Sequence, residues 1–207
     1  MEDNVTKSPA RVADDAVVDE RARLLAGTVV WNLSQVREGA VVGKDCTIGR
    51  NVYIGAGVQV ADRVKIQNNC LIYEPAFVES GVFIGPAVVF TNDAHPRAIT
   101  PSGQVKAASD WDAVGVTVRQ GASIGARAVC VAPVEVGRWA LVAAGAVVTR
   151  DVPNFAMVAG VPAAFKGWVG KTGRRLQRIS DSSFRCPDTG EIFSEIDGDL
   201  EEEGCNK

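Results

Sequence analysis

Residues 41–60 read VVGKDCTIGRNVYIGAGVQV, and an apolar side chain returns in this stretch at every sixth position. The same step of six runs without exception from Val30 to Phe90, over eleven positions, and it resumes from Val118 to Val148 over six more. The positions four residues after each of these, beginning with Ser34, are small or β-branched. Neither the helical period of 3.6 nor the strand period of 2 produces a strict repeat of six.

The repeat predicts a β-solenoid in which each group of six residues supplies one short strand and one turn. The stepped residue points inward, the small residue packs near the corner, and Gly or Asn eases the turn. Three groups close one triangular coil, so seventeen groups predict five to six coils, stacked about 4.8 Å apart. A prism this narrow has little room for large side chains, which accounts for 32 valines, 27 alanines and 21 glycines beside only 6% aromatic residues.

The repeat also divides the chain into parts. We expect a polar, flexible lead over residues 1–28 and a prism domain over residues 29–163. A loop over residues 91–117 interrupts the prism, and long excursions from a rigid scaffold are common places for function. Residues 164–196 form a small C-terminal extension, and residues 197–207 have the composition of an acidic, disordered tail.

The composition excludes several classes of protein. A net charge of −3 is unsuited to a basic nucleic-acid-binding surface, so no nucleic-acid partner is expected. No apolar run is long enough to span a bilayer, so no membrane partner is expected. Five cysteines without a C-x-x-C pair, and an acidic N-terminus unlike an export signal, predict reduced thiols in a cytoplasmic protein. A single histidine rules out any metal site built from two or three histidines.

The C-terminal extension holds a smaller repeat, because KTG at 171–173 recurs as DTG at 188–190. Paired turns of this kind resemble a zinc ribbon, but a zinc ribbon needs four ligands and only Cys186 stands in such a place. The sequence therefore predicts two hairpin turns that pack on the prism or on a neighbouring subunit, and no metal.

Several motifs resemble the hexapeptide-repeat family of left-handed β-helix acyltransferases over residues 29–168. Near its end the prism carries VAAGAVVTRDVP at 142–153 and VAGVPA at 158–163, a signature similar to the acetyl-CoA end of that family. Four further segments resemble the branch that acetylates the 3-amino group of nucleotide-linked sugars: VVWN at 29–32, KIQNN at 65–69, FTNDAHPRA at 90–98 and WVG at 168–170. Members of that branch often carry His where Asn32 stands in this chain.

The resemblance implies an all-β fold, a left-handed parallel β-helix with an insertion loop and a small C-terminal extension, although the general crossover preference is right-handed. It also implies a homotrimer, with acetyl-CoA as co-substrate in the groove between two prisms. The candidates for binding the phosphopantetheine arm are four small residues of the last coils: Ala126, Ala143, Ala144 and Gly145. The candidates for binding the CoA phosphates are two basic residues, Arg150 and Lys166. Corner packing is the alternative for the four small residues, and a solvated surface is the alternative for the cations.

The implied activity is transfer of acetyl from acetyl-CoA to the 3-amino group of a UDP- or dTDP-linked sugar. This reaction needs a deprotonated amine held in line with the thioester. Asn92 is a candidate to accept a hydrogen bond from that amine. His95 is a candidate general base, because histidine titrates near neutral pH, although an amine can also lose its proton to water or to the leaving thiolate. Candidates for substrate binding are Asp93, Arg97, Gln67, Asn68 and Tyr73.

Each substrate-binding candidate has a structural alternative. Asp93 can cap a turn of the loop, and Arg97 can brace the loop. Gln67 and Asn68 can belong to a ladder of amides along a turn, and Tyr73 can be a contact within a trimer.

Two other functions compete with this one. The chain could be an acetyl-CoA-dependent transferase for a different small acceptor, such as an O-acetyltransferase, or a non-catalytic solenoid. The polar loop at 92–97 argues against both. A γ-type carbonic anhydrase on the same fold needs three histidines on neighbouring coils, and His95 is alone. The sequence leaves open UDP or dTDP as the nucleotide, and a 6-carboxylate or a 6-methyl group on the sugar.

Overall fold

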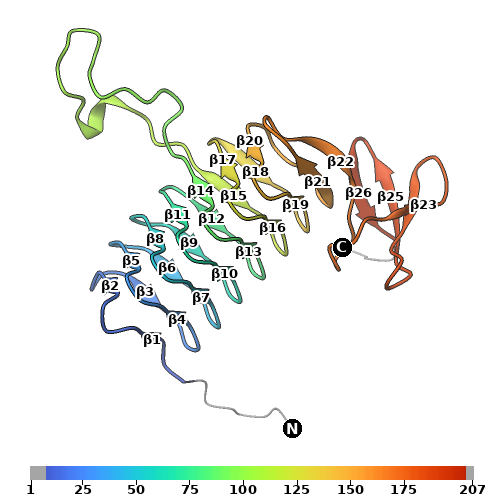
Figure 1. The fold of residues 1–207 in the computed structure, drawn as a ribbon, viewed down its shortest axis with the longest axis horizontal. Coiled ribbons are helices and arrows are strands. Elements are labelled where there is room, and N and C mark those ends of the chain that lie inside the picture. The colour runs from blue at the N-terminus through green and yellow to red at the C-terminus, as the bar shows by residue number, and fades with distance from the viewer. Residues whose placement is uncertain (1–7, 204–207) are drawn as a thin grey trace.

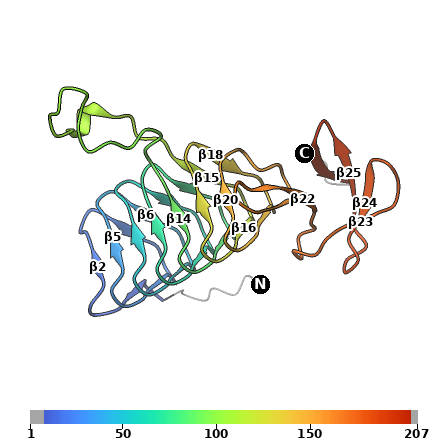
Figure 2. The ribbon, with the colours of Figure 1, turned by 45° about the horizontal axis from the view of Figure 1, so that its top comes forward.

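The protein folds as a prism of short parallel strands, with a small antiparallel sheet at its C-terminal end (Figure 1). The structure is a computed structural model that describes residues 8–203. A long loop leaves the prism between β14 (Val89–Phe90) and β15 (Val116–Val118) and projects away from it, as Figures 1 and 2 both show. The expected left-handed parallel β-helix, with its insertion loop and C-terminal extension, is confirmed.

The strands of the prism form three faces, which the chain visits in turn. The first face holds β1 (Arg11–Val12), β4 (Val29–Val30), β7 (Thr47–Ile48), β10 (Lys65–Ile66), β13 (Phe83–Ile84), β16 (Ser123–Ile124), β19 (Leu141–Val142) and β21 (Ala156–Ala159), with β22 (Ala164–Trp168) added antiparallel to β21. The second face holds β2 (Val17–Val18), β5 (Gln35–Val36), β8 (Tyr53–Ile54), β11 (Leu71–Ile72), β14, β17 (Val129–Cys130) and β20 (Val147–Val148). The third face holds β3 (Arg23–Leu24), β6 (Val41–Val42), β9 (Gln59–Val60), β12 (Phe77–Val78), β15 and β18 (Val134–Val136).

The strict step of six places every stepped residue in the interior. All seventeen predicted inward residues, from Val30 to Val148, are at most 3% exposed. Strand partners on neighbouring coils are eighteen residues apart, as in Ile48 beside Ile66. Each coil of eighteen residues therefore consists of three strands and three turns, with six residues for one strand and its turn. Burial of each Val or Ile contributes about 1.5–3 kcal/mol to the stability of the fold.

The first coil corrects one expectation. Residues 11–24, expected to belong to a flexible lead over 1–28, form β1–β3 and pair with the coil above. The reason is that Val12, Val18 and Leu24 continue the step of six backwards from Val30. The solenoid accordingly has about eight turns, more than the five to six expected. Residues 1–7 lie outside the described residues.

The insertion loop is two residues shorter than expected. Val116 and Thr117 belong to β15, and β15 pairs with β12 across the gap that the loop leaves in the sequence. The loop itself spans residues 91–115 and contains one short 3-10 helix, η1 (Ala108–Asp110). Within residues 8–203, no helix is long and apolar enough to cross a membrane.

The C-terminal extension is a four-stranded antiparallel sheet of β23 (Gln177–Arg178), β24 (Ser183–Arg185), β25 (Ile192–Ile196) and β26 (Asp199–Glu202). It covers the end of the prism, where the rings of Phe155 and Phe193 lie 5.2 Å apart. The expected acidic tail over 197–207 is wrong for its first part, because the buried side chain of Leu200 holds β26 on the sheet. Residues 204–207 lie outside the described part of the chain.

The two turns of the KTG and DTG repeat face each other. Thr172 Oγ1 lies 3.8 Å from Cys186 Sγ, and a Cβ on Gly170 would come 3.2 Å from the same sulfur. Among residues 8–203 there is no group of three or more metal-ligating side chains.

Candidate functional site

Apart from Lys166 on β22, the predicted site residues fall on two corners of the prism, at opposite edges of the second face. The first corner contains the turns between the first and second faces, and the second corner contains the turns between the second and third faces. Because the coils repeat in register, residues at one corner form columns along the prism. The first corner carries, from bottom to top, Gln67 and Asn68, then Gly85 and Pro86, then Gly125 and Ala126, then Ala143, Ala144 and Gly145.

The lower turns of the first corner are capped by side chains from the coil above. The N–H of Arg50 donates to Asn68 Oδ1 at 2.9 Å. The structure thus supports the amide ladder, the structural alternative for Asn68. The half-buried Gln67 makes no side-chain hydrogen bond within residues 8–203. The side chain of Asn32 donates to Asp15 Oδ1 in the neighbouring coil at 2.8 Å.

The upper turns of the first corner lack these caps. Ala144 stands one coil above Ala126, where a capping Asn would lie, and Gly160 stands likewise above Ala144. The N–H groups of Ala126 and Ala144 therefore have no acceptor within the described part of the chain. The backbones are also close, because a Cβ on Gly85 would lie 2.7 Å from Ala126 N. A Cβ on Gly125 would overlap Ala144 N. The result is a narrow wall of small residues with two free N–H donors, about one strand spacing apart.

The second corner carries the base of the insertion loop. Asn92 O accepts from Val114 N at 3.0 Å, which ties the outgoing and returning segments of the loop together. Asp93 Oδ1 accepts from His95 N at 2.7 Å, so Asp93 does cap a loop turn. His95 is exposed, and the guanidinium of the exposed Arg97 donates to a backbone oxygen of its own loop.

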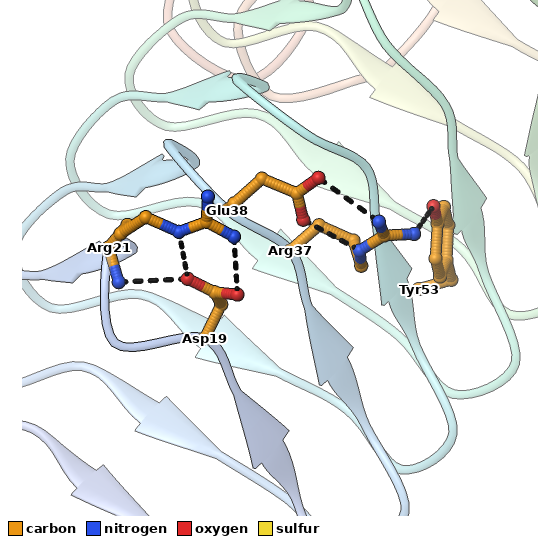
Figure 3. Close-up of polar contacts among 5 residues, drawn as sticks. All are labelled: Asp19, Arg21, Arg37, Glu38 and Tyr53. Atoms are coloured by element: carbon orange, nitrogen blue, oxygen red, sulfur yellow. Dashed lines mark hydrogen bonds and ion pairs between the residues drawn. The ribbon is translucent and has the colours of Figure 1, made fainter.

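A charged and aromatic cluster lies lower on the second corner and the second face. Tyr73 packs against Tyr53 with ring centroids 5.2 Å apart. The Tyr53 hydroxyl accepts from Arg37, which also pairs with Glu38 at 2.8 Å (Figure 3). The hydrogen bonds from Arg37 hold the pKa of Glu38 below its ordinary value. Tyr53 and Arg37 were not predicted from the sequence, although both lie within one or two coils of Tyr73.

Arg150 stands at the top of the second corner, beside a cavity of about 420 Å³. Thr149, Pro162, Ala163 and Phe165 also line that cavity, whereas Lys166 is exposed on β22 and does not. A neighbouring cavity of about 330 Å³ is unsuited to an anion, because four carboxylates line it: Glu135, Asp151, Asp197 and Asp199.

One chain does not bring the two corners together. Ala143 and Ala144 lie at one edge of the second face, Asn92 and His95 lie at the other, and the loop points away from the prism (Figures 1 and 2). Between the corners, the outward side chains of the upper second face are apolar and half-buried: Leu71, Val89, Val129 and Val147.

Comparison with known proteins gives matches over much of the prism. A model described as "Bacterial transferase hexapeptide (six repeats)" matches residues 45–79, and one described as "Hexapeptide repeat of succinyl-transferase" matches residues 115–150. The dTDP-3-amino-3,6-dideoxy-α-D-galactopyranose 3-N-acetyltransferase of Aneurinibacillus thermoaerophilus is 46% identical over 66 residues, 32% of this chain and 34% of that protein. The bifunctional protein GlmU of Nitratidesulfovibrio vulgaris is 30% identical over 153 residues, 70% of this chain and 33% of that protein. The chain spans about a third of the length of these curated relatives.

Two solved structures share the fold. The acetyltransferase domain of PglB from Neisseria gonorrhoeae, in complex with acetyl coenzyme A, has a TM-score of 0.51 at 21% identity and covers 77% of this chain and 58% of its own. A hexapeptide-repeat acetyltransferase from Vibrio cholerae, also complexed with acetyl coenzyme A, has a TM-score of 0.50 at 22% identity and covers 64% of this chain and 72% of its own. The repeat-built prism and the two matching family models together place this chain in the hexapeptide-repeat family of bacterial transferases.

Proposed function

We propose that the chain is an acetyl-CoA-dependent N-acetyltransferase that acts in the cytoplasm on the 3-amino group of a UDP- or dTDP-linked sugar. The observation that carries this proposal is the polar base of the loop, where the side-chain amide of Asn92 makes no hydrogen bond within residues 8–203. The printed name of the Aneurinibacillus relative, a 3-N-acetyltransferase for a dTDP-linked amino sugar, supports the acceptor class.

The first corner fits the donor. A pantetheine arm is thin and carries amide carbonyls, and the free N–H groups of Ala126 and Ala144 are matched donors on a wall without large side chains. Arg150, beside the cavity of about 420 Å³, is suited to the CoA phosphates. The acetyl-CoA named in the descriptions of both solved structures supports the same donor.

The active site, on this proposal, is completed by a second copy of the chain in a homotrimer. The donor wall and the loop base lie at opposite edges of the second face, so a donor held on one prism is best reached by the loop of its neighbour. The apolar side chains between the two corners supply a surface that such packing would bury.

In the proposed reaction, Asn92 Oδ1 accepts one N–H of the sugar amine and directs the nitrogen lone pair toward the thioester carbonyl carbon. The nitrogen forms the new C–N bond, the C–S bond breaks, and the amine proton passes to the leaving thiolate. Arg97 and Tyr73 would contact the pyrophosphate and the nucleobase, and Gln67 would contact a sugar hydroxyl. A protein base is not required in this scheme, and His95 is its candidate if one takes part.

The test is release of free thiol from acetyl-CoA in the presence of UDP- and dTDP-linked 3-amino sugars and their 3-hydroxy counterparts. We expect release with at least one amino sugar and with none of the hydroxy compounds. Release with hydroxy compounds alone would overturn the acceptor class, as would CoA binding without release from any compound. Absence of both release and CoA binding, measured by calorimetry, would overturn the transferase itself.

Three of the five thiols of the protein, Cys46, Cys70 and Cys130, contribute little background to this assay. Burial raises the pKa of Cys70 to about 11 and that of Cys130 to about 12, and it also raises the pKa of Cys46. These buried thiols are protonated at neutral pH and react slowly with a disulfide reagent.

A further inference from the structure

A cavity of about 290 Å³ lies at the joint between the prism and the C-terminal sheet. It is formed by β22, at the end of the first face, together with the strands and turns of the extension (Figure 2). None of the residues proposed above to bind acetyl-CoA or the sugar lines it. Its lining includes three aromatic rings, two guanidinium groups and one carboxylate: Phe165, Trp168, Phe184, Arg175, Arg178 and Glu195. Aromatic side chains with a few charged groups are the usual lining of a small-molecule site.

Phe165 offers an open aromatic ring to this cavity. The ring stands against that of Trp168, with centroids 4.7 Å apart and planes at 67°. Trp168 is itself fixed, because it is buried and its Nε1 donates to Glu195 Oε2 at 3.2 Å. Phe165 is nevertheless 52% exposed, which leaves part of its ring without a contact in the chain. A planar group in the cavity can stack on Phe165 while Trp168 keeps its place.

Arg175 supplies a cation to the same cavity. Its side chain has no hydrogen-bond or ion-pair partner within the described part of the chain. The guanidinium lies beside β22, since a Cβ on Gly167 would be 3.9 Å from Arg175 Nη1. The second cation, Arg178, is already engaged, because it donates to the carbonyl oxygens of Ser180 at 3.0 Å and Asp181 at 2.5 Å. An anion that enters the cavity therefore finds its free partner in Arg175.

Glu195 supplies the remaining polar group. Its Oε2 accepts from Trp168, whereas its Oε1 accepts no hydrogen bond within residues 8–203. A carboxylate in this position selects for a ligand with N–H or O–H donors. The cavity thus combines an open aromatic ring, a free cation and a free acceptor.

We propose that this cavity binds a nucleotide. A nucleobase is planar and carries N–H donors at its edge, so it can stack on Phe165 and donate to Glu195 Oε1. A phosphate group is the anion that a planar guanidinium binds through two parallel hydrogen bonds, and Arg175 is free to do so. An aliphatic anion would match only Arg175, and an uncharged aromatic compound only Phe165.

Two sources can supply this chemistry: a free mononucleotide, or the adenosine 3′-phosphate end of CoA. The test measures binding to the native chain, to Arg175→Gln and to Arg174→Gln by calorimetry at pH 7. Arg174 is the matched control, because it is the adjacent residue and is exposed, but it pairs with Asp188 at 3.3 Å and does not line the cavity. The probes are 3′-AMP, UMP, dTMP, acetyl-CoA and acetyl-pantetheine.

We expect Arg175→Gln to raise the Kd of the bound nucleotide about tenfold or more, which is the loss of a charged hydrogen bond. Arg174→Gln should stay within about twofold of the native chain. A loss for mononucleotides with an unchanged Kd for acetyl-CoA assigns the cavity to a free nucleotide. A loss for acetyl-CoA but not for acetyl-pantetheine assigns it to the adenosine end of CoA.

Three outcomes would overturn the inference: no binding of any nucleotide probe to the native chain, native affinity in Arg175→Gln, or an equal loss in Arg174→Gln. Acetyl transfer plays no part in these measurements. A chain that binds nucleotides as expected but releases no thiol therefore fails the proposed function and leaves the nucleotide site intact.

A second comparison needs no variant of Arg175. Ribose 5-phosphate carries the anion without the base, so it should bind the native chain at least about tenfold more weakly than the preferred mononucleotide. Phe165→Leu keeps an apolar side chain but removes the ring, and it should reduce this difference. Equal affinity for ribose 5-phosphate and every mononucleotide would contradict stacking of a base on Phe165.

Discussion

At the scale of single residues, Asn92 and His95 differ in how they are held. Asn92 is tied to the returning segment of the loop through Val114, whereas His95 is exposed and, within residues 8–203, is bonded only through its backbone to Asp93. We expect Asn92→Ala to lower kcat about tenfold or more, because the amine loses its orienting acceptor. We expect His95→Ala to lower kcat by less than about tenfold. Removal of a general base would lower it by about 10²–10⁴. Steady-state kinetics on both variants measures this, and a hundredfold loss in His95→Ala would make that residue the base.

Asp19 gives a prediction about acid stability. Hydrogen bonds from the side chain and backbone of Arg21 lower the pKa of Asp19 from 3.8 to about 2 (Figure 3). A carboxyl whose pKa is lower in the folded state stabilises the fold above its unfolded pKa, and that contribution disappears as the pH falls toward 2. We expect Asp19→Asn to flatten the fall in Tm between pH 4 and pH 2, by a small amount because the pair is at the surface.

Asp14→Asn is the control for this experiment. Asp14 lies in the same coil, is exposed, and has no side-chain partner within the described residues. Thermal unfolding at a series of pH values should distinguish Asp19→Asn from Asp14→Asn only at the acid end. An equal response of both variants would show that the Asp19–Arg21 contact does not contribute to stability.

At the scale of the strand, β10 allows the inward and outward positions to be compared directly. Ile66 is fully buried and its neighbour Lys65 is exposed. Ile66→Ala should lower the free energy of unfolding by about 2–5 kcal/mol, because the coils above and below cannot close on the cavity. Lys65→Ala should change it by less than about 0.5 kcal/mol. Urea unfolding followed by circular dichroism measures both, and a loss under about 1 kcal/mol in Ile66→Ala would contradict the packing.

The strands of the prism were predictable because their period is a property of the coil itself. The same step reached β1–β3, but the charged residues around Val12, Val18 and Leu24 concealed it. β26 was missed for a similar reason, since Leu200 is the single apolar residue in an acidic segment. The path of the loop was not predictable, because residues 91–115 have no periodicity and their course is set by individual contacts such as Asp93 with His95.

The candidate site was predictable in part. A coil of eighteen residues places Arg37 two coils below Tyr73, so the sequence contained that neighbour, although the motif alone did not indicate it. Whether an amide caps a turn, as Asn68 does, or stays free, as Gln67 does, depends on rotamers and on the coil below. The pairing of Arg37 with Glu38 and Tyr53 likewise depends on side-chain direction, which spacing does not determine.

At the scale of the whole molecule, the second face determines whether one chain is enough for activity. Its upper part is apolar and lies between the donor wall and the loop base, so we expect three chains of 21.9 kDa to associate through it. Val129→Glu places a charge in the middle of this surface and should yield monomers that release no thiol. Ser123→Glu is the control, because Ser123 faces outward from the first face in the same coil. Light scattering and the thiol assay measure both variants, and an active monomeric native chain, or an active trimer of Val129→Glu, would contradict a site shared between copies.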